Sequence, residues 1–203
     1  MEINTESLKW KDAYKLIQGS VLPRPIAFVS SQDEEGHDNL APFSFFTAIS
    51  ADPMMVCFSP MRRGTDGAKK DTLKNIEATK QFVINIVSEE IVQQMNDCAT
   101  EFSSEVDEFE ASGLTKAQSF AVQPRRVKES QVHLECELDQ VVHYGGDHAG
   151  AGSLVIGKVI HVHVNDELYE NGRINTEKLN PVGRLAGATY TLPMAKTFEL
   201  QRK

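Results

Sequence analysis

The loop at residues 60–72 concentrates the side chains that are best suited to holding an anion. Its cations lie directly before a predicted helix start that carries a carboxylate and a hydroxyl. These residues are Arg62, Arg63, Lys69, Lys70, Asp71 and Thr72. The first N–H groups of a helix have no partner within the helix, and the positive end of its dipole attracts anions. The pattern favours a monophosphate pocket; a solvated basic loop with an ordinary helix cap is the open alternative.

A second segment with chemical character is the apolar run at residues 43–50, which three hydroxyl side chains interrupt. Ser44, Thr47 and Ser50 need hydrogen-bond partners inside a strand, because burial of an unpaired polar group costs free energy. A flat, half-polar ligand would supply such partners. Hydrogen bonds to the backbone of a twisted strand would satisfy the hydroxyls equally well, so both interpretations stay open.

The chain offers few side chains for direct catalysis. His161, His163 and Glu167 form a His-x-His-x-x-x-Glu pattern that is similar to the first metal motif of cupins. No histidine follows His163 in the sequence, so the ligand set is short and we predict no metal. Motifs for a P-loop, a nucleophile elbow or a zinc protease are absent from the sequence. An enzyme of this kind would let a bound cofactor perform the chemistry, and we expect no catalytic acid or base from the protein.

Composition and charge narrow the class of protein. The 203 residues are 40% hydrophobic with a net charge of -8, an ordinary globular composition that disfavours nucleic-acid binding. The apolar runs are far shorter than the roughly 20 residues of a membrane span. The acidic N-terminus has no signal-peptide pattern, and three isolated cysteines fit a reducing compartment. We therefore expect one cytoplasmic domain over residues 1–203, without a membrane or nucleic-acid partner.

Hydrophobic periodicity and turn residues predict the elements that must position these groups. Helices are expected near 7–18, 71–80 and 88–95, and strands near 25–31, 39–46, 54–59 and 82–87. Ser7 and Ser88 would cap the first and third helices, and Gly19 would stop the first. The polar, acidic residues 97–125 are expected to form a surface excursion with one or two helical turns.

Two long strands follow, one starting near 132 and one at 154–164. In the first of them, apolar residues alternate with polar ones such as His133 and Glu135, which predicts that one face is buried. The glycine-rich loop 145–152 either lets a ligand approach the backbone or simply closes a hairpin, and the hairpin is favoured. Many strands with few long helices predict a β-barrel with peripheral helices.

Several segments resemble, in the same order, the flavin reductase-like family. They are residues 23–30, 39–46, 52–53, 70–76, 106–110, 113–115 and 135–136. The resemblance covers about residues 20–190, nearly the whole chain. It implies an FMN-binding split β-barrel, that is, a mainly β (α+β) fold with peripheral helices. It also implies a homodimer that holds the flavin near the subunit interface.

The resemblance further implies roles for the segments described above. The flavin ring is expected along Ser44, Phe45, Phe46, Thr47 and Ala48. The phosphate is expected at Ser59, Arg62, Arg63, Lys70, Asp71 and Thr72. Residues 184–190 are similar to the family pattern Arg-Leu-Gly-Gly-x-x-Tyr, with Ala186 as a departure, and this adds Tyr190 to the cofactor-binding set. The Gly-Asp-His motif ending at His148 matches the one that short-chain flavin reductases use toward NADH, which implies a nicotinamide contact.

The activity implied by the resemblance is an NAD(P)H-dependent flavin reductase. Such an enzyme transfers hydride from the nicotinamide to the flavin and can supply reduced flavin to a partner monooxygenase. The alternative is a flavoredoxin-like FMN electron carrier that does not oxidise NAD(P)H. A metal-dependent cupin is the third hypothesis, carried only by His161, His163 and Glu167.

Overall fold

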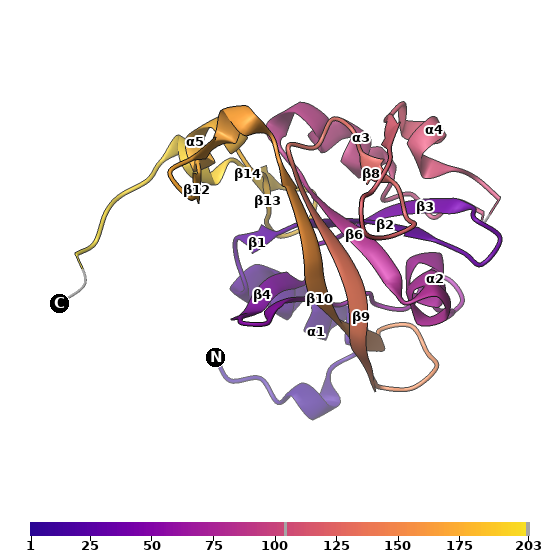
Figure 1. The fold of residues 1–203 in the computed structure, drawn as a ribbon. Helices are drawn as coiled ribbons and strands as arrows, with labels where there is room; N and C mark the ends of the chain where they lie inside the picture. The colour runs from indigo at the N-terminus through magenta and orange to yellow at the C-terminus, as the bar shows by residue number, and fades with distance from the viewer. Residues whose placement is uncertain (104, 202–203) are drawn as a thin grey trace.

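A seven-stranded antiparallel sheet dominates the fold in the computed structural model, which describes residues 1–103 and 105–201 (Figure 1). The strand order is β3-β2-β6-β9-β10-β5-β4, so β3 and β4 form the two edges. The strands are β2 Ala27–Gln32, β3 Asp38–Phe43, β4 Phe46–Ala51, β5 Met54–Phe58, β6 Gln81–Ile86, β9 Val132–Tyr144 and β10 Gly152–Val164.

Short helices surround this sheet. They are α1 Trp10–Ser20, α2 Asp71–Thr79, α3 Val92–Asp97, α4 Glu108–Ser112 and α5 Thr176–Leu179. A small sheet pairs β1 Arg24–Pro25 with β13 Gly183–Arg184, and β13 with β14 Tyr190–Thr191. No helix in the described part of the chain is long and apolar enough to cross a membrane. The predicted mainly β fold with peripheral helices is confirmed.

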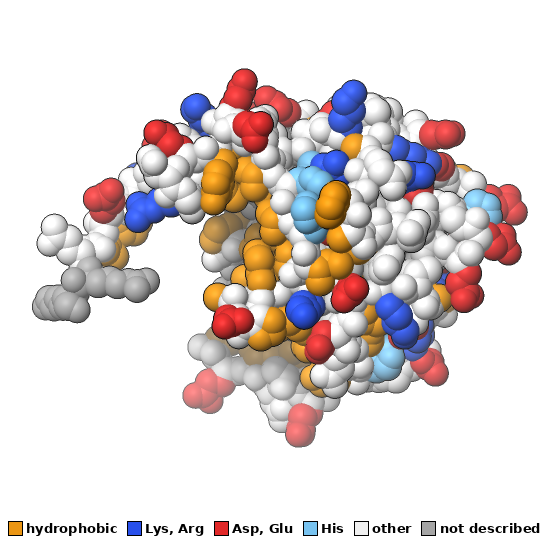
Figure 2. All heavy atoms as spheres, in the orientation of Figure 1, with side chains coloured by type: hydrophobic (Ala, Val, Ile, Leu, Met, Phe, Trp, Pro, Cys, Tyr) orange, Lys and Arg blue, Asp and Glu red, His pale blue; other side chains and the backbone are white. Residues whose placement is uncertain are grey.

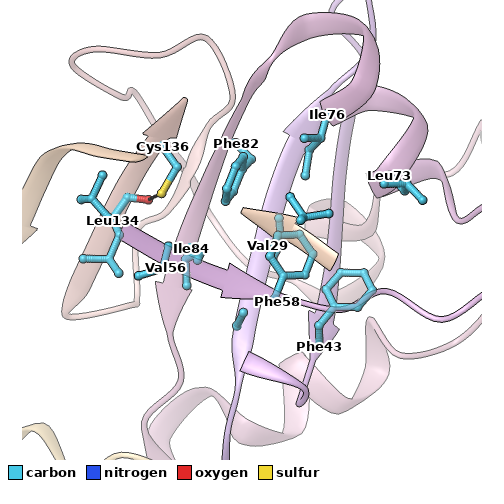
Figure 3. Packing of buried hydrophobic residues seen from close by; sticks show 13 residues of the cluster. Val29, Phe43, Val56, Phe58, Leu73, Ile76, Phe82, Ile84, Leu134 and Cys136 are labelled. Atoms are coloured by element: carbon cyan, nitrogen blue, oxygen red, sulfur yellow. Dashed lines mark hydrogen bonds between the residues drawn. The ribbon is translucent and has the colours of Figure 1, made fainter. Parts of the chain in front are cut away.

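The main core lies between the sheet and α2 (Figure 3). The Phe58 and Phe82 rings meet edge to face with centroids 5.6 Å apart, and Leu73 and Ile76 of α2 pack against the same cluster. A second cluster contains Met95 of α3 and the fully buried Phe109 of α4. Because α2 is anchored through fully buried side chains, its N-terminus is held in a fixed place.

Close packing in the core depends on one glycine of β10. A Cβ atom added at Gly157 would lie 2.4 Å from a carbon of the Phe82 ring. The ring therefore rests directly on the strand backbone, which is the usual reason for glycine within a strand.

The first helix differs from its prediction at both ends. It begins at Trp10, after a 3₁₀ turn at Thr5–Ser7, and ends at Ser20. Ser7 does not cap it, because its hydroxyl donates to Asn4 O at 3.0 Å. Gly19 lies inside the helix, so the predicted stop is wrong. No residue of α1 is buried, so its ends are not fixed by core packing.

The predicted strand at 39–46 is divided, and the apolar run at 43–50 is not one strand. β3 ends at Phe43, a bend follows at residues 44–45, and β4 begins at Phe46. The chain crosses here from one edge of the sheet to the other. Ser44 is the polar residue at the bend, and a single hydroxyl in an apolar run does not signal a change of strand partner.

The start of β9 is buried on both faces, although its alternation predicts one exposed face. His133 is 5% exposed and Glu135 is fully buried. The backbone N–H groups of Phe120 and Ala121 donate to the Glu135 carboxylate at 2.8 and 2.5 Å. The covering segment comes from the polar stretch at 97–125, which a local pattern cannot place over a strand.

The remaining predictions in the middle of the chain hold for element type. The helix at Asp71–Thr79, the strand at Gln81–Ile86 and the β9–β10 hairpin are all present. The described part of the stretch at 97–125 includes the short helix α4. Ser88 precedes a 3₁₀ turn at Glu89–Ile91 but makes no cap, and its buried hydroxyl has no hydrogen-bond partner among the described residues.

Candidate functional site

The N-terminus of α2 is open to a ligand. Its N-cap residue, Lys70, makes no side-chain cap, so the first backbone N–H groups are free of that competitor. A hollow of about 80 Å³ opens beside it, with Phe43, Arg63, Lys70 and Thr72 in its lining. We call this space the polar hollow. An uncapped helix start with two cations and a hydroxyl is suited to a phosphate group.

Carboxylates of the same chain pair with the cations around the polar hollow. Arg63 forms an ion pair with Asp71, whose other oxygen lies 2.9 Å from Lys74 Nζ. Lys70 Nζ lies 3.7 Å from Glu101, a residue of a separate loop that also accepts from Thr65 Oγ1 at 3.3 Å. The 3.7 Å pair is long enough for an incoming anion to replace it.

A buried network behind the hollow fixes Thr72. The Thr72 hydroxyl donates to Asn39 Oδ1 at 2.6 Å, and Asn39 Nδ2 donates to Glu108 at 2.8 Å. The second Glu108 oxygen accepts from Leu40 N–H at 3.1 Å. Burial raises the pKa of Glu108, although these hydrogen bonds act in the opposite direction. Asn39 and Glu108 are missing from the predicted site, even though both lie in the segments at 39–46 and 106–110 that carry the family resemblance.

The glycine-rich loop of the β9–β10 hairpin lies on the cation loop. Arg62 N–H donates to Ala151 O at 2.9 Å, and the Arg62 side chain reaches both Gly67 O, at 2.9 Å, and the Asp147 carboxylate. A Cβ atom at Gly67 would lie 3.2 Å from the His148 backbone. The loop closes the β9–β10 hairpin, and its role in ligand approach stays a prediction. His148 is exposed at its tip, with Nδ1 3.0 Å from Ala149 O.

A second hollow, of about 250 Å³, borders the same loop at Gly150 and Gly152. Its lining is mainly aromatic and apolar: Trp10, Ala13, Tyr14, Ile17, Phe45, Ser59, Met61, Tyr144, Gly150 and Gly152. We call it the aromatic hollow. The Tyr14 and Phe45 rings lie 6.2 Å apart, and Ser59 N–H donates to Phe45 O at 2.8 Å. A Cβ atom at Gly150, where φ is +94°, would lie 2.7 Å from Trp10, so α1 closes directly on the loop.

The predicted ring residues lie at and after the bend between β3 and β4. Ser44 accepts from Arg24 Nε at 3.4 Å, which gives its hydroxyl a protein partner. Phe46 packs against the main core. Thr47 and Ala48 are exposed on the edge strand β4. The Thr47 hydroxyl donates to Ala48 O at 3.3 Å, which gives it a partner within its own strand.

Tyr190 is placed apart from the other predicted residues. It lies on β14, packs against the second cluster, and its hydroxyl donates to Asn96 Oδ1 at 3.0 Å. Tyr190 lines neither the polar nor the aromatic hollow. Its role in cofactor binding stays a prediction.

The histidine motif serves the fold. His163 Nε2 lies 2.5 Å from Glu135, and His161 stacks on Phe120 with ring centroids 4.6 Å apart. Glu167 is not a partner of either ring, and the described residues contain no cluster of three or more that could hold a metal. The cupin hypothesis is wrong, since its first two ligands are engaged in the packing of segment 118–127 on β9 and β10.

Burial and hydrogen bonding shift the pKa values of Glu135 and of the neighbouring His133. Burial tends to raise the pKa of Glu135, but the two backbone N–H groups and His163 outweigh it and hold the pKa below its usual value. Burial lowers the pKa of His133 to about 4. His133 Nε2 lies 2.7 Å from Val127 O, so the ring is bonded while neutral.

Comparison with known proteins gives a consistent result over nearly the whole chain. Residues 19–179 match the model of the flavin reductase like domain. Nitrilotriacetate monooxygenase component B from Bacillus cereus is 38% identical, with a TM-score of 0.92 and 98% of each chain covered. The 2-nitrobenzoate 2-nitroreductase NbaA from Pseudomonas fluorescens is 31% identical, with a TM-score of 0.88 and 100% and 96% covered.

A solved structure with a similar fold is described as a split barrel. A Shewanella frigidimarina protein described as a flavin reductase with a split barrel domain is 23% identical, with a TM-score of 0.82 and coverage of 100% and 98%. This likeness concerns the fold alone. The curved sheet with edges β3 and β4 is thus a split barrel, as the resemblance implies.

Proposed function

The chain belongs to the flavin reductase-like domain family, and on that basis we propose that it binds FMN and reduces it with NAD(P)H. Bound FMN would supply the acceptor for a hydride from the nicotinamide and would pass the electrons on. The protein supplies binding, orientation and the electrostatic environment. No acid or base of the chain is required for a hydride transfer between two cofactors.

The uncapped N-terminus of α2 at the polar hollow is the observation that carries this proposal. A phosphate there would accept hydrogen bonds from backbone N–H groups at the helix start and would face Arg63 and Lys70. Thr72 is held at the same place by Asn39. These donors fit a phosphomonoester, and Arg62 lies close by under the hairpin loop.

The flavin ring would lie toward Phe45 and β4. Phe45 and Ser59 both line the aromatic hollow, next to the corner where Phe43 borders the polar hollow. Thr47 and Ala48 follow on an exposed edge, where backbone N–H and C=O groups remain available to a polar ring. An apolar wall with a polar edge suits a ring that is aromatic across its faces and polar along one side.

The nicotinamide would approach from the side of the glycine-rich loop. His148 is exposed at the tip of this loop, close to Arg62 and Gly67. We expect His148→Ala to raise KM for NADH while the protein still binds FMN. An unchanged KM for NADH would remove His148 from the substrate site.

The names of two similar structures suggest which molecule accepts the electrons of the reduced flavin. One similar structure is a monooxygenase component and another is a nitroreductase. We therefore favour transfer of reducing equivalents to a partner monooxygenase. A flavoredoxin-like carrier that holds FMN without oxidising NAD(P)H is the second candidate.

An anaerobic reduction experiment separates these functions. The purified protein is loaded with FMN, freed of excess flavin, and mixed with NADH or NADPH without oxygen. Rapid bleaching of the visible flavin absorbance supports the reductase. A yellow protein that keeps its colour with both nucleotides, and bleaches with dithionite, supports the carrier and contradicts the reductase.

A further inference from the structure

A groove of about 750 Å³ lies where β9 begins and β10 ends. His133 and His163, which pair directly across these two strands, lie in its lining. We call it the charged groove, because charged side chains also line it, among them Glu90, Arg126, Lys128 and Glu167. Its lining residues differ from those of the polar hollow and the aromatic hollow. A ligand in the charged groove would therefore occupy a site separate from that proposed for the flavin.

Arg126 is a partly buried cation with unused donors. Its side chain is 19% exposed. Nε and Nη2 donate to Gln118 O at 3.2 and 2.8 Å, and Nη1 lies 3.4 Å from His133 Nδ1. Each terminal nitrogen of a guanidinium carries two N–H groups. One N–H group on each of them thus has no partner among the described residues.

The carboxylate beside Arg126 does not use these donors. Glu135 lies 3.9 Å from Arg126 Nε, which is too far for a hydrogen bond. The Glu135 oxygens already accept from two backbone N–H groups and lie against the His163 ring. Arg126 therefore has a nearby negative charge but no hydrogen-bonded carboxylate, and a ligand could bind it without displacing a partner of Glu135.

A second cation lies close to Arg126 in the chain. Lys128 follows β8 Arg126–Val127 and lines the same groove. Its side chain is exposed and has no carboxylate partner in the part of the chain that the structure describes. Figure 2 shows Lys and Arg side chains beside histidine side chains over this end of β9 and β10, in the upper part of the view. A planar guanidinium next to an ammonium group is suited to a carboxylate.

Two carboxylates of the groove are also unpaired. Glu90 lies in the 3₁₀ turn Glu89–Ile91, and Glu167 lies in the 3₁₀ turn Asp166–Leu168. Both residues are exposed, and neither carboxylate has a hydrogen bond or an ion pair with another described residue. These two carboxylates come from elements other than the segment of Arg126 and Lys128, so the groove carries free charges of both signs.

The other charged groups in the lining are already engaged. The Glu129 carboxylate accepts from Thr115 N–H at 3.0 and 3.1 Å. Lys178 Nζ donates to Glu167 O at 3.2 Å, which leaves the Glu167 carboxylate free. The charges that remain for a ligand are two positive and two negative.

We propose that the charged groove binds a small zwitterion, with its carboxylate on Arg126 and Lys128 and its ammonium group toward Glu90 and Glu167. A ligand with negative charge alone would be repelled by the two carboxylates, and one with positive charge alone by the two cations. Since the groove is open to water, each charge contributes modestly, and we expect a dissociation constant on the order of 1 mM. The site does not depend on FMN, so it is tested on flavin-free protein.

The test is a titration of the protein with ε-aminocaproate, followed by the NMR signals of the histidine rings. The signals of His133 and His163 should shift and saturate, because both rings line the groove. His37, which is absent from the lining, should not respond. Caproate, which lacks the ammonium group, should bind about 10-fold more weakly, and hexylamine, which lacks the carboxylate, should bind more weakly still.

Substitutions separate the two ends of the ligand. Lys128→Gln should weaken the binding of ε-aminocaproate and of caproate by about 5-fold each. Glu167→Gln should weaken only ε-aminocaproate, since caproate has no ammonium group for this carboxylate. Arg126→Lys keeps the charge but loses the planar fork, and it should weaken both ligands by about 10-fold. Lys158→Gln, at an exposed cation of β10 outside the groove, should change neither.

Three results would each overturn the proposal. They are ring signals that do not saturate with ε-aminocaproate, caproate that binds as tightly as ε-aminocaproate, and Lys128→Gln protein that binds both ligands like the wild type. Circular dichroism on each variant checks that it is folded. If Arg126→Lys unfolds the protein, the exposed residues Lys128 and Glu167 still decide the question.

Discussion

The β9–β10 hairpin joins two regions with opposite properties. At the end formed by His133, Glu135 and His163, which we call the closed end, Glu135 is fully buried and bonded to His163, and the buried His133 ring is bonded to Val127 O. At the other end, the loop at 145–151 contacts Arg62 through Ala151 O and Asp147, and Gly150 lines the aromatic hollow. We call this the open end. One hairpin thus supports the fold at one end and presents a binding surface at the other.

The difference lies in whether a ligand can replace the existing partners. Glu135 is fully buried, and three donors of the chain bind its oxygens. Lys70 is partly exposed, and its partner Glu101 lies 3.7 Å away on a separate loop. Exchange of the Glu135 partners requires local unfolding, whereas exchange of the Lys70 partner requires one side chain to move. The comparison predicts that changes at the closed end alter stability, and that changes at the open end alter binding.

The largest effect is expected at the closed end, from Glu135→Gln. The amide keeps the shape but presents N–H groups to donors, so the free energy of unfolding should fall by about 3–5 kcal/mol. Urea unfolding measures this. The control Glu137→Gln changes an exposed residue of the same strand and should be nearly neutral. A stable Glu135→Gln protein that loses FMN affinity would break the comparison.

Acid should destabilise the protein through His133. The pKa of the buried ring is about 4, below the usual 6.5, so the unfolded chain binds the extra proton first as the pH falls. Stability should decrease between about pH 6.5 and 4, by up to about 3 kcal/mol. His133→Gln should flatten this part of the profile.

His37 is the control for the assignment of the acid sensitivity to His133. The pKa of His37 is raised by its hydrogen bond to Asp33, and the ring is exposed. His37→Gln should leave the loss of stability between about pH 6.5 and 4 in place. A profile that His133→Gln does not change would mean that another group causes the acid sensitivity.

At the open end, the double change Arg63→Ala/Lys70→Ala should weaken FMN binding by about 100-fold, because two charge-assisted hydrogen bonds are lost. Fluorescence titration measures the affinity. Riboflavin, which lacks the phosphate, should bind the variant and the wild type alike. Lys74→Ala removes a cation that also pairs with Asp71 but is absent from the polar hollow, and it should have little effect. An equal loss for both flavins would indicate a damaged fold.

The smallest effect concerns Glu101. Its carboxylate pairs with Lys70 and Thr65, so Glu101→Gln should remove a competitor and tighten FMN binding several-fold. Added salt should reduce the gain, because it screens exposed pairs. Glu110→Gln, on the exposed side of α4, is the control. Weaker binding by the Glu101 variant would show that this residue helps to hold the ligand.

The phosphate end of the site can be predicted from the sequence because the residues that indicate it are close together in the chain. The cations at 62–70 and the helix start at Asp71 lie within one short segment, and the helix forms where the pattern predicts it. Asn39 and Glu108 could not be predicted as site residues, because the hydrogen bonds from Thr72 to Asn39 and from Asn39 to Glu108 join distant parts of the chain. The family resemblance includes the segments of Asn39 and Glu108 but does not indicate the role of either residue.

The ring end and the closed end depend on tertiary structure. The break at residues 44–45 follows from a change of sheet edge, which has no local signature. His161 and His163 have the spacing of a metal site, yet packing with Phe120 and Glu135 uses them. Burial of both faces of β9 comes from a covering segment that is distant in sequence. Such long-range coverage decides which polar residues are structural and which are free to bind.

The most direct test of the central claim is a titration of the flavin-free wild type with FMN and, in parallel, with riboflavin. The account predicts one FMN bound per chain, and riboflavin binding weaker by at least about 10-fold, since the phosphate contributes charge-assisted hydrogen bonds at the start of α2. No uptake of FMN, or equal affinity for the two flavins, would contradict a phosphate-binding site at the open end.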